Sequence, residues 1–337
     1  MENKNTTNNI LLECKNLRTA FYMEGDKVVH AVSGVSYYVK RNEVVGVVGE
    51  SGCGKSVTQM SVMQLIAKPG RVLDGDVTFD GEPMLVHGAP VVDMEKIRGN
   101  RISMIFQEPM TSLNPVFTVG EQMTDIVKKH KNVSKKEAWE IATNALDAVG
   151  IPDAAARMKN YPFEMSGGMR QRVLIALSVA CETDLIIADE PTTALDVTVQ
   201  AQVMELLMDV KRKNNSSVIV VTHNLGLISR YADRIYVMYA GKVIESGTTE
   251  DILTNPKHPY TKGLLAAVPK LEDEKRAQLV PIDGAPPSLS DLPDYCSFYD
   301  RCPFRTEACK TKGIPELTEV GPNEHFSACH LNSKEVF

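Results

Sequence analysis

The stretch Gly49-Glu50-Ser51-Gly52-Cys53-Gly54-Lys55-Ser56 decides which fold is expected of this chain of 337 residues. It follows the apolar run Val44–Val48 and precedes a helical pattern, which is the setting that a phosphate-binding loop requires. Its glycines let backbone N–H groups turn toward phosphates, and the start of the helix adds positive potential. Lys55 would reach the β- and γ-phosphates, and Ser56 would bind Mg²⁺. The stretch therefore predicts a nucleotide-binding loop, with an incidental Gly-rich turn as the alternative.

A second apolar run, Asp184–Ala188, ends in the carboxylates Asp189 and Glu190. Because the carboxyl ends of parallel strands meet at one edge of a sheet, both are expected beside the phosphate loop. Asp189 suits the Mg²⁺ shell, since Mg²⁺ prefers oxygen ligands, and Glu190 suits a general base for an attacking water. A strand end carrying two solvated acids is the alternative interpretation.

Two further polar residues follow predicted strands. Gln107 follows Ile102–Phe106 and could contact Mg²⁺ or the water, while His223 follows Ser217–Thr222 and could hydrogen-bond a γ-phosphate. Either residue alone would be read as a surface residue. Beside the two motifs above, both become candidates for the catalytic site.

Ser166-Gly167-Gly168 precedes another predicted helix, which extends to about Cys181. Ser166 is a natural N-cap, and the two glycines leave the backbone bare, so that a phosphate could approach the helix start. One nucleotide needs one main cradle, so this second cradle makes sense if it serves a nucleotide on another subunit. Simple helix capping is the alternative.

The alternation of short apolar runs with helical patterns up to about Gly247 predicts an α/β fold with a mostly parallel sheet. Earlier runs succeed one another like hairpins and predict an antiparallel portion: Leu11–Phe21, Val28–Val39 and Asp76–Asp80. Residues 119–164 are helical without strands, and Ser134 and Glu137 are spaced as a capping box. After Gly247 prolines become frequent, and a short helix is expected near Thr261–Ala267.

These patterns predict a nucleotide-binding domain over residues 10–250, with a helical subdomain at about 108–165, followed by a Cys-rich C-terminal extension over 251–337. The composition, 43% hydrophobic and 24% charged, is that of a globular protein. The net charge of −6 disfavours nucleic acid as a partner. We find no signal peptide and no apolar run long enough to span a bilayer, so a soluble protein that meets the membrane through a partner is expected.

Together these motifs resemble the ATPases of ABC transporters over about residues 10–247. The matching segments, in chain order, are Walker A (Gly49–Ser56), the Q-loop (Gln107), the signature (Ser166–Gly168), Walker B (Ile186–Glu190), the D-loop (Ala194-Leu195-Asp196) and the switch (His223). The resemblance implies a P-loop NTPase cassette with a mixed sheet, a RecA-like core and a helical subdomain. It also implies that Phe21, or its neighbour Tyr22, stacks on adenine and that Asp196 and the signature lie close to nucleotide.

Other segments resemble one branch of that family. Met165-Ser166-Gly167-Gly168-Met169 replaces the general LSGGQ signature, and the second methionine is typical of peptide importers. His258–Leu265 and Gly284–Leu289 resemble the C-terminal extension of the D-type ATPases of dipeptide and oligopeptide permeases. The resemblance implies a subunit that hydrolyses ATP to energise import of di- and oligopeptides. Nickel import is an alternative, and a soluble ABC ATPase acting on nucleic acid or ribosomes is a weaker one.

The same resemblance implies partners and a location. A homologous ATPase subunit, a paralogue or a second copy, would pair head to tail with this chain, so that each phosphate loop faces the other subunit's Ser166–Gly168. Two transmembrane permease subunits would dock on the helical insert after Gln107, with an extracytoplasmic peptide-binding protein beyond them. The chain would then be peripheral, on the cytoplasmic face of the cell membrane, with no nucleic acid involved.

Four of the seven cysteines lie close to the end of the chain: Cys296, Cys302, Cys309 and Cys329, spaced C-x5-C-x6-C-x19-C. Four thiolates could bind an iron–sulfur cluster or zinc, although the tight C-x2-C pairs of common zinc sites are missing. Peptide-permease ATPases are similar here, and some hold a [4Fe–4S] cluster, which is the expectation. Zinc, with His325 or His330 as possible ligands, and free thiols are the alternatives.

Overall fold

The computed structural model describes residues 9–107, 112–193, 196–267 and 282–332. The chain divides into two compact units. The first unit comprises Met1–Val92 with Thr222–Phe337, and the second unit comprises Asp93–Val221. Among the described residues, no helix has the length and apolar character needed to cross a membrane.

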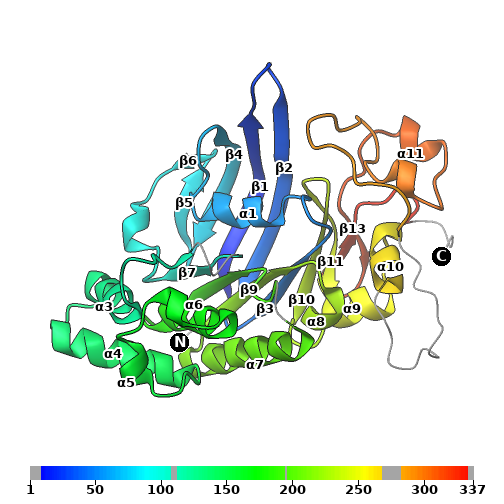
Figure 1. The fold of residues 1–337 in the computed structure, drawn as a ribbon. Helices are drawn as coiled ribbons and strands as arrows, with labels where there is room; N and C mark the ends of the chain where they lie inside the picture. The colour runs from blue at the N-terminus through cyan, green and yellow to red at the C-terminus, as the bar shows by residue number, and fades with distance from the viewer. Residues whose placement is uncertain (1–8, 108–111, 194–195, 268–281, 333–337) are drawn as a thin grey trace, which may run out of the picture. The chain divides into compact units, whose positions relative to one another are not determined.

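One sheet of the first unit is wholly antiparallel, with the strand order β2-β1-β4-β5-β6 (Figure 1). Its strands are β1 (Ile10–Tyr22), β2 (Val28–Lys40), β4 (Gly70–Phe79), β5 (Glu82–Val86) and β6 (Ala89–Pro90). The pairs Leu12–Phe79 and Cys14–Val77 place buried side chains opposite one another. Such cross-strand apolar pairs stabilise an antiparallel sheet, and the expected antiparallel portion is confirmed.

Helix α1 (Lys55–Val62) contacts this sheet through two buried hydrogen-bonding pairs. The hydroxyls of Ser61 and Thr19 lie 2.7 Å apart, and the Tyr37 hydroxyl donates to Gln59 Oε1 at 2.9 Å. Buried polar groups are costly unless they are paired, so these contacts fix the helix that follows the phosphate loop.

A second set of strands in the first unit has the order β12-β13-β11-β10-β3. β3 (Val44–Val48) is parallel to β10 (Arg234–Tyr239), and every residue of both strands is buried. β11 (Lys242–Thr248), β13 (His325–Ser327) and β12 (Thr318–Gly321) continue antiparallel. The C-terminal extension thus adds two strands beside β11, in addition to packing side chains against the cassette.

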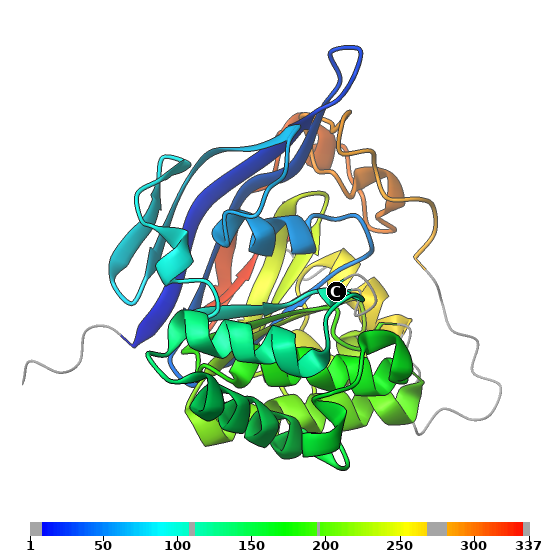
Figure 2. The same cartoon turned by 60° about the vertical axis from the view of Figure 1, so that its left-hand side comes forward.

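The second unit contains the parallel strands β7 (Ile102–Ile105), β8 (Leu185–Asp189) and β9 (Ser217–Thr222). β8 and β9 are buried along their whole length, as expected for parallel strands covered on both faces. The helices of this unit lie together as one group in Figure 2. They are α3 (Val119–His130), α4 (Lys135–Ala148), α5 (Ala154–Arg157), α6 (Gly167–Val179) and α7 (Val197–Asn214). Two short 3₁₀ turns, η1 (Met94–Lys96) and η2 (Pro162–Glu164), also belong to the unit. The expected α/β class is confirmed.

Local signals explain where several helices begin. The predicted capping box forms at α4, where Glu137 N–H donates to Ser134 Oγ and Ser134 N–H donates to Glu137 Oε2. A second box, which the sequence analysis did not single out, forms at α3 between Thr118 and Glu121. Helix α6 ends at Val179, two residues before the predicted end.

The extension contains α9 (Thr249–Thr254), α10 (Pro259–Ala266), η3 (Tyr299–Arg301) and α11 (Ala308–Thr311), and α8 (Leu225–Ile228) precedes β10. The prediction near Thr261–Ala267 placed the start of α10 two residues late. Pro259 occupies the first turn, and His258 Nδ1 accepts the Tyr260 N–H at 3.0 Å as a cap. A histidine is not a usual N-cap, which is why the sequence pattern missed it.

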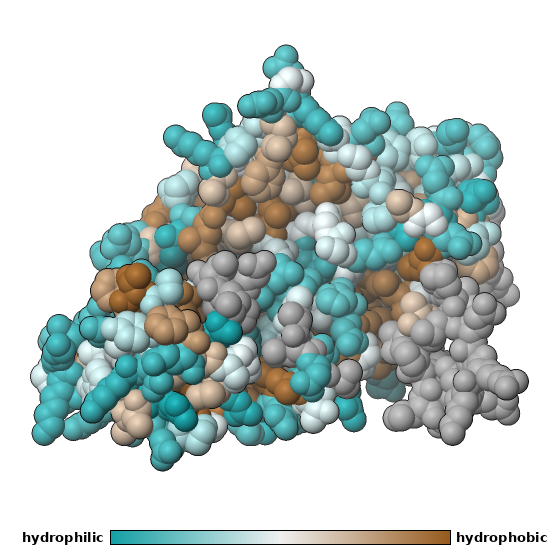
Figure 3. All heavy atoms as spheres, in the orientation of Figure 1, coloured by the Kyte–Doolittle hydropathy of each residue, from teal (hydrophilic) through white to brown (hydrophobic). Residues whose placement is uncertain are grey.

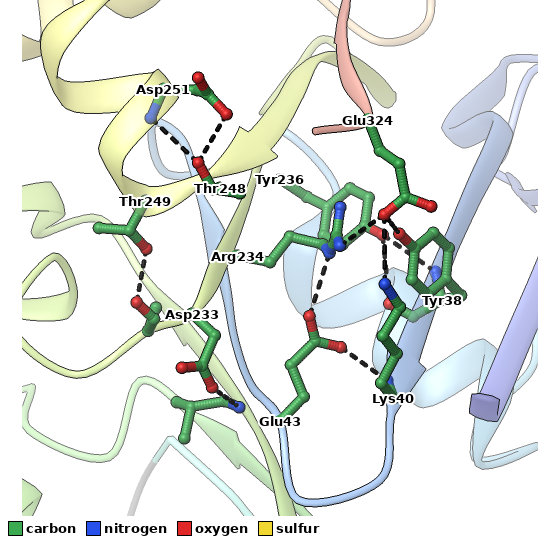
Figure 4. A network of polar contacts seen from close by, with 12 residues as sticks. Tyr38, Lys40, Glu43, Asp233, Arg234, Tyr236, Thr248, Thr249, Asp251 and Glu324 are labelled. Carbon is green, nitrogen blue, oxygen red and sulfur yellow. Dashed lines mark hydrogen bonds and ion pairs between the residues drawn. The ribbon is translucent and has the colours of Figure 1, made fainter. Parts of the chain in front are cut away.

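Two separate sets of hydrogen-bonded side chains join the end of the chain to the strands of the cassette. Arg234 donates to Glu43 Oε1 at 3.1 Å and to Glu324 Oε2 at 2.9 Å, and the Tyr38 hydroxyl also donates to Glu324 (Figure 4). Separately, the fully buried His325 and Glu245 pair at 2.9 Å. Glu245 also accepts the backbone N–H groups of Lys257 and His258. These contacts tie β13 and the start of α10 to β11.

Candidate functional site

The phosphate loop of the first unit holds its lysine within the loop itself. Lys55 is 4% exposed, and its Nζ donates to the carbonyl oxygens of Gly49 at 2.8 Å and Glu50 at 3.0 Å. Gly54 has φ +100°, and a Cβ there would lie 2.2 Å from the Ala31 carbonyl oxygen. Only glycine fits that position, so the sequence forces the backbone to curl around the space in front of Lys55.

Helix α1 begins at Lys55 without a side-chain cap, whereas α3, α4, α6 and α7 each have one. The first N–H groups of a helix need partners, and a phosphate is a suitable acceptor. Ser56, in the first turn, is partly buried, while Ser51 and Gly52 at the crest of the loop are exposed. The loop therefore presents N–H donors and a cation to the same space.

Cys53 lies inside this loop and is 5% exposed. Its burial raises the pKa of the thiol, although the charge of Lys55 acts in the opposite direction. The thiol therefore stays protonated near neutral pH, and Cys53 acts as a small packing residue of the loop. Its sulfur would lie 2.8 Å from a Cβ at Gly49, so the two residues pack closely.

Glu50, the second residue of the loop, is held by two residues of the C-terminal extension that the sequence analysis did not assign to the site. Arg301 donates from Nη1 to Oε2 at 2.6 Å and from Nη2 to Oε1 at 2.8 Å. The hydroxyl of the buried Tyr260 accepts the Glu50 N–H at 2.9 Å. The positive charge of Arg301 near the cysteines was the only signal in the sequence. No sequence pattern indicates that Arg301 and Glu50, which are 251 residues apart, would meet.

The two aromatic candidates for adenine stacking differ in exposure. The Phe21 ring packs over Gly70, where a Cβ would lie 2.6 Å from the ring. Tyr22 is 45% exposed, and the Arg71 guanidinium lies over its ring at 5.5 Å. Phe21 is therefore engaged in packing on its β4 side, and Tyr22 has the more accessible ring.

In the second unit, Glu190 follows β8 and is oriented by two donors. Gln107 Nε2 donates to Oε2 at 3.1 Å, and Thr193 Oγ1 donates to the same oxygen at 2.7 Å. Glu190 is 9% exposed and has φ +46°, a left-handed conformation that is uncommon for a residue other than glycine. Backbone strain of this kind is concentrated at functional sites. Asp189, the last residue of β8, is 4% exposed.

The structure thus brings Gln107 and Glu190 into contact, as two of the candidate catalytic residues. Thr193 was not singled out from the sequence, because a threonine after Walker B carries no chemistry of its own. His223 of the first unit directly follows β9 and is exposed, and Asn224 next to it caps α8. Asp196 is an exposed N-cap, and its Oδ1 accepts the Val199 N–H at 3.0 Å. Ala194 and Leu195 of the predicted D-loop lie outside the described residues.

Ser166 caps α6, accepting the Met169 N–H at 3.3 Å, as predicted. A side chain at either of the two glycines that follow would meet almost nothing in the part of the chain that the structure describes. A Cβ at Gly167 would have no atom within 4 Å, and one at Gly168 would have only Val199 Cγ1 at 3.9 Å. Glycine at the start of a helix costs stability relative to alanine, so packing within this chain does not explain these residues. The requirement for a bare backbone must come from something that approaches the surface.

The four terminal cysteines line one small cavity of about 10 Å³, together with His330 and Arg305. Burial is the main reason that the pKa of Cys302 rises to about 11 and that of Cys329 to about 12, and the neighbouring cysteines raise both further. Backbone N–H groups of Phe304 and Leu331 act in the opposite direction by donating to these sulfurs.

Four thiols line this one cavity, and thiolates are the ligands that soft metals and iron–sulfur clusters prefer. Even so, no three Cys, His, Asp or Glu side chains among the described residues are grouped closely enough to hold a metal ion. All four cysteines are free thiols. His325, suggested above as a zinc ligand, is instead buried against Glu245.

Exposed apolar side chains gather near the start of α3 in the second unit. They are Val116, Phe117, Tyr161 and Phe163, which we call the α3 patch, with exposed fractions of 38–70%. The rings of Tyr161 and Phe163 stack with centroids 5.4 Å apart. The Val119 N–H donates to the Asn160 carbonyl oxygen, which joins the two segments, and apolar surface is visible at this end of the unit in Figure 3.

Comparisons with known proteins agree with this arrangement. A family model described as ABC transporter matches residues 32–193, and one described as the oligopeptide/dipeptide transporter C-terminal region matches residues 244–309. The chain is 49% identical over 327 residues to the dipeptide transport ATP-binding protein DppD of Bacillus subtilis, covering 97% of this chain and 96% of that protein. It is 48% identical over 329 residues to the oligopeptide transport ATP-binding protein OppD of Salmonella typhimurium, with coverage of 97% and 96%.

A solved structure of the ATP-binding cassette MJ0796, a dimer in a post-hydrolysis state with ADP and phosphate, has a TM-score of 0.62 and 26% identity. The match covers 71% of this chain and 99% of that one. The relatives match nearly the whole chain, including the extension. The chain belongs to the family of ABC transporter ATP-binding subunits of the dipeptide and oligopeptide permease type.

Proposed function

We propose that this chain hydrolyses ATP and thereby energises import of di- and oligopeptides through a membrane permease. The observation that carries the ATPase assignment is Glu190, a buried carboxylate at the end of a parallel strand, held by Gln107 and Thr193 in a strained conformation. Full-length similarity to dipeptide and oligopeptide transport subunits supports the cargo class.

The residues have distinct roles in this proposal. The loop N–H groups and Lys55 bind and orient the phosphates of ATP. Ser56, Asp189 and Gln107 would hold Mg²⁺, which neutralises charge on the phosphates when bound. Glu190 accepts the proton of the attacking water, and a carboxylate with fixed hydrogen bonds needs little reorganisation to do so. His223 would hydrogen-bond the γ-phosphate, and Tyr22 or Phe21 would stack on adenine.

The second cradle, Ser166–Gly168, supports a head-to-tail pair of ATPase subunits. Among the described residues, a Cβ at Gly167 would meet no atom within 4 Å and one at Gly168 only Val199 Cγ1. We therefore assign these glycines to the γ-phosphate of ATP on a homologous subunit, with Asp196 near the same interface. ATP would close such a pair and hydrolysis would open it, a two-state motion biased by the nucleotide. The partner would be a second copy or a paralogue.

The α3 patch supports a membrane partner. Exposed aromatic residues that stack on each other beside a helix are typical of docking surfaces. We assign this patch to two transmembrane permease subunits, which places the chain at the cytoplasmic face of the cell membrane as a peripheral subunit. An extracytoplasmic peptide-binding protein would deliver cargo to the same permease.

Replacing Glu190 with Gln tests the ATPase assignment. Glutamine keeps the size and can still contact Gln107, but it cannot accept a proton, so turnover should fall by about 100-fold or more while ATP affinity is kept. ATPase rate and nucleotide binding, measured on the same purified protein, check this. Glu182→Gln, an exposed glutamate of the same unit, is the matched control. Normal turnover in Glu190→Gln would remove Glu190 from its role.

For the four terminal cysteines we propose a [4Fe–4S] cluster, with zinc as the alternative metal. The shared cavity and the N–H donors to sulfur support a site that holds the extension together. Protein purified without oxygen should contain about four irons and four sulfides per chain. Cys302→Ser should lower the iron content and the thermal midpoint of the extension, while Cys14→Ser, a buried cysteine elsewhere, should leave the iron content unchanged. Zinc alone would reject the cluster, and metal-free protein of full stability would reject both.

A further inference from the structure

The C-terminal extension reaches into the nucleotide site of its own chain. Arg301 makes two hydrogen bonds to the Glu50 carboxylate, and the Tyr260 hydroxyl accepts the Glu50 N–H. Glu50 is the second residue of the phosphate loop, and its carbonyl oxygen accepts a hydrogen bond from Lys55. One loop residue is therefore held at its carboxylate and its N–H by the extension, and at its carbonyl oxygen by the catalytic lysine.

The surroundings of these contacts make them strong. The Arg301 side chain is 6% exposed, and Glu50 is 27% exposed. Arg301 also donates to the Asp283 carbonyl oxygen at 3.0 Å, and its guanidinium lies 5.8 Å from the Tyr239 ring. Tyr239 in turn packs against Tyr260 in a tilted contact, and Phe298 meets both rings edge to face, with centroids 4.7–5.5 Å apart. A paired charge in such a site has few other conformations, so it restrains Glu50 closely.

We propose that Arg301 and Tyr260 are positioning residues of the ATP site, which hold the phosphate loop in its binding conformation from the C-terminal extension. They touch no phosphate themselves. Their effect passes through the backbone of Glu50 to the N–H groups that follow it and to Lys55. A loop that is already ordered loses less entropy when it binds a phosphate, so it binds ATP more tightly. The proposal rests on the proposed function, because it concerns the same nucleotide site.

The test is a double-mutant cycle on Glu50 and Arg301 in the full chain. Glu50→Gln and Arg301→Gln should each raise the Kd for ATP by roughly 10-fold, as loss of a charge-assisted hydrogen bond implies. The double variant should be no weaker than either single one, because both remove the same interaction. Lys312→Gln is the control, since Lys312 is an exposed cation of the same extension.

Tyr260→Phe keeps the aromatic packing and removes one hydroxyl, so it remains informative if Arg301→Gln fails to fold. It should raise the Kd for ATP several-fold with little change in the thermal midpoint. Arg301→Lys, which keeps the charge but not the two-pronged contact, should restore part of the affinity. A merely structural role would lower the thermal midpoint together with the affinity for ATP.

Two results would overturn the proposal: unchanged ATP affinity in Glu50→Gln and Tyr260→Phe, or effects of Glu50→Gln and Arg301→Gln that simply add. Failure of the proposed function is a different result, because it would show as absent ATP hydrolysis in the unmodified protein with its partners. Normal hydrolysis together with unaffected variants would reject the positioning role alone.

A different observation carries a second inference. Arg18 of β1 and Lys242 of β11 line a cavity of about 470 Å³ in the first unit. Neither side chain forms an ion pair or hydrogen bond with any residue in the described ranges of the chain. Burial, together with the nearby charge of Arg18, lowers the pKa of Lys242. Arg18 is exposed, Lys242 is partly buried, and the carboxylate of Glu316 also lines the cavity. The two cations repel each other, and an anion bound between them would relieve that cost.

The rest of the cavity wall combines polar and apolar groups. Asn16, Ser33 and Ser36 supply amide and hydroxyl groups beside the cations, and Phe298, Val243 and Leu317 supply apolar surface. The volume lies in the range of small-molecule sites, and a few polar groups among apolar ones are typical of such sites. We infer that this cavity binds a small organic anion, a carboxylate joined to an apolar group.

Calorimetric titration of the full chain tests this with N-acetyl-trileucine and octanoate, two carboxylates of different origin. At least one should bind, and N-acetyl-trileucine amide, which lacks the charge, should bind at least about 10-fold more weakly than its acid. A double variant that carries Arg18→Gln and Lys242→Gln should weaken binding by a similar factor. The control Lys15→Gln, on the same strand as Arg18, should not. The inference fails if neither carboxylate binds by about 10 mM, or if the amide or the double variant binds equally well.

Discussion

The arrangement around Glu190 depends on single atoms. One carboxylate oxygen accepts from both Gln107 and Thr193, and the Glu190 N–H donates to the Val221 carbonyl oxygen at 2.9 Å. The left-handed backbone at φ +46° is kept because these three contacts over-determine it. A fixed carboxylate orients a water better than a mobile one, which is consistent with the proposed role of Glu190 as the general base.

Glu324 is a second residue whose environment has a measurable consequence. Hydrogen bonds from Tyr38 and Lys40, and the charge of Arg234, lower the pKa of its carboxyl group to about 2 from 4.5 (Figure 4). The folded pKa lies below the unfolded one, so this contribution to stability is complete above pH 4.5. It is lost as the pH falls toward 2.

We therefore expect Glu324→Gln to lower the free energy of unfolding by about 1 kcal/mol at pH 7, because the pair is half exposed and screened. The difference from the unmodified protein should shrink as the pH falls from 4.5 and vanish near pH 2. Urea unfolding at several pH values measures it. Glu319→Gln, an exposed residue of the adjoining strand, serves as the control. A difference that stays constant down to pH 2 would contradict the assigned cause.

At the scale of elements, the helix starts differ in what satisfies their N–H groups. α3, α4 and α7 are capped by their own side chains, whereas α1 has no side-chain cap and α6 begins with two bare glycines. The first group is explained by local folding. Helices α1 and α6 follow the two predicted phosphate-binding segments. Although Ser166 caps α6, we propose that both starts keep backbone groups accessible to phosphate.

Gly168→Ala separates folding from function at α6. The added Cβ would contact only Val199 Cγ1 at 3.9 Å, and alanine favours a helix over glycine, so stability should stay equal or rise by up to about 1 kcal/mol. ATP hydrolysis should fall by about 10-fold or more, because the methyl group would block the approach of a phosphate from the paired subunit. Thermal unfolding and the ATPase rate, measured in the presence of the partner ATPase, check both parts. Full activity would mean that these glycines do not face a nucleotide.

At the scale of the whole molecule, the chain carries two kinds of surface for other proteins. The α3 patch is apolar and aromatic, as expected for docking onto a permease, and the start of α6 is polar and bare, as expected for a nucleotide-dependent contact. The extension adds strands β12 and β13 beside β11 and reaches Glu50 through Arg301. It therefore belongs structurally to the ATP-binding half of the cassette.

Phe163→Glu tests the docking surface. Phe163 is 67% exposed, so a charge there should leave the thermal midpoint of the isolated chain within a degree or two. Burying that charge against a partner is costly, and binding to the permease subunits should weaken by about 10-fold or more. Co-purification with the permease in detergent measures this. Val91→Glu, at a residue of the first unit that is 52% exposed, is the control. Equal recovery of the permease with both variants would exclude the α3 patch.

Sequence patterns predicted the features that depend on neighbours along the chain. The capping box of Ser134 and Glu137 and the cap at Ser166 are confirmed, because a cap is complete within four residues. The buried strands β3, β8 and β9 were visible as short apolar runs. The start of α10 was misplaced, because its cap is a histidine made suitable by burial and by Glu245, which is remote in sequence.

By itself, the sequence determined that this chain is an α/β ATPase cassette, since glycine, lysine and carboxylate spacing encode the local backbone that phosphates require. Only the tertiary structure decided that Arg301 and Tyr260 hold Glu50, that β13 pairs with β11, and that Arg18 and Lys242 line one cavity. The physical reason is distance along the chain. Such contacts form only once the hydrophobic core has brought remote segments together, and no periodicity or local motif records which residues will meet.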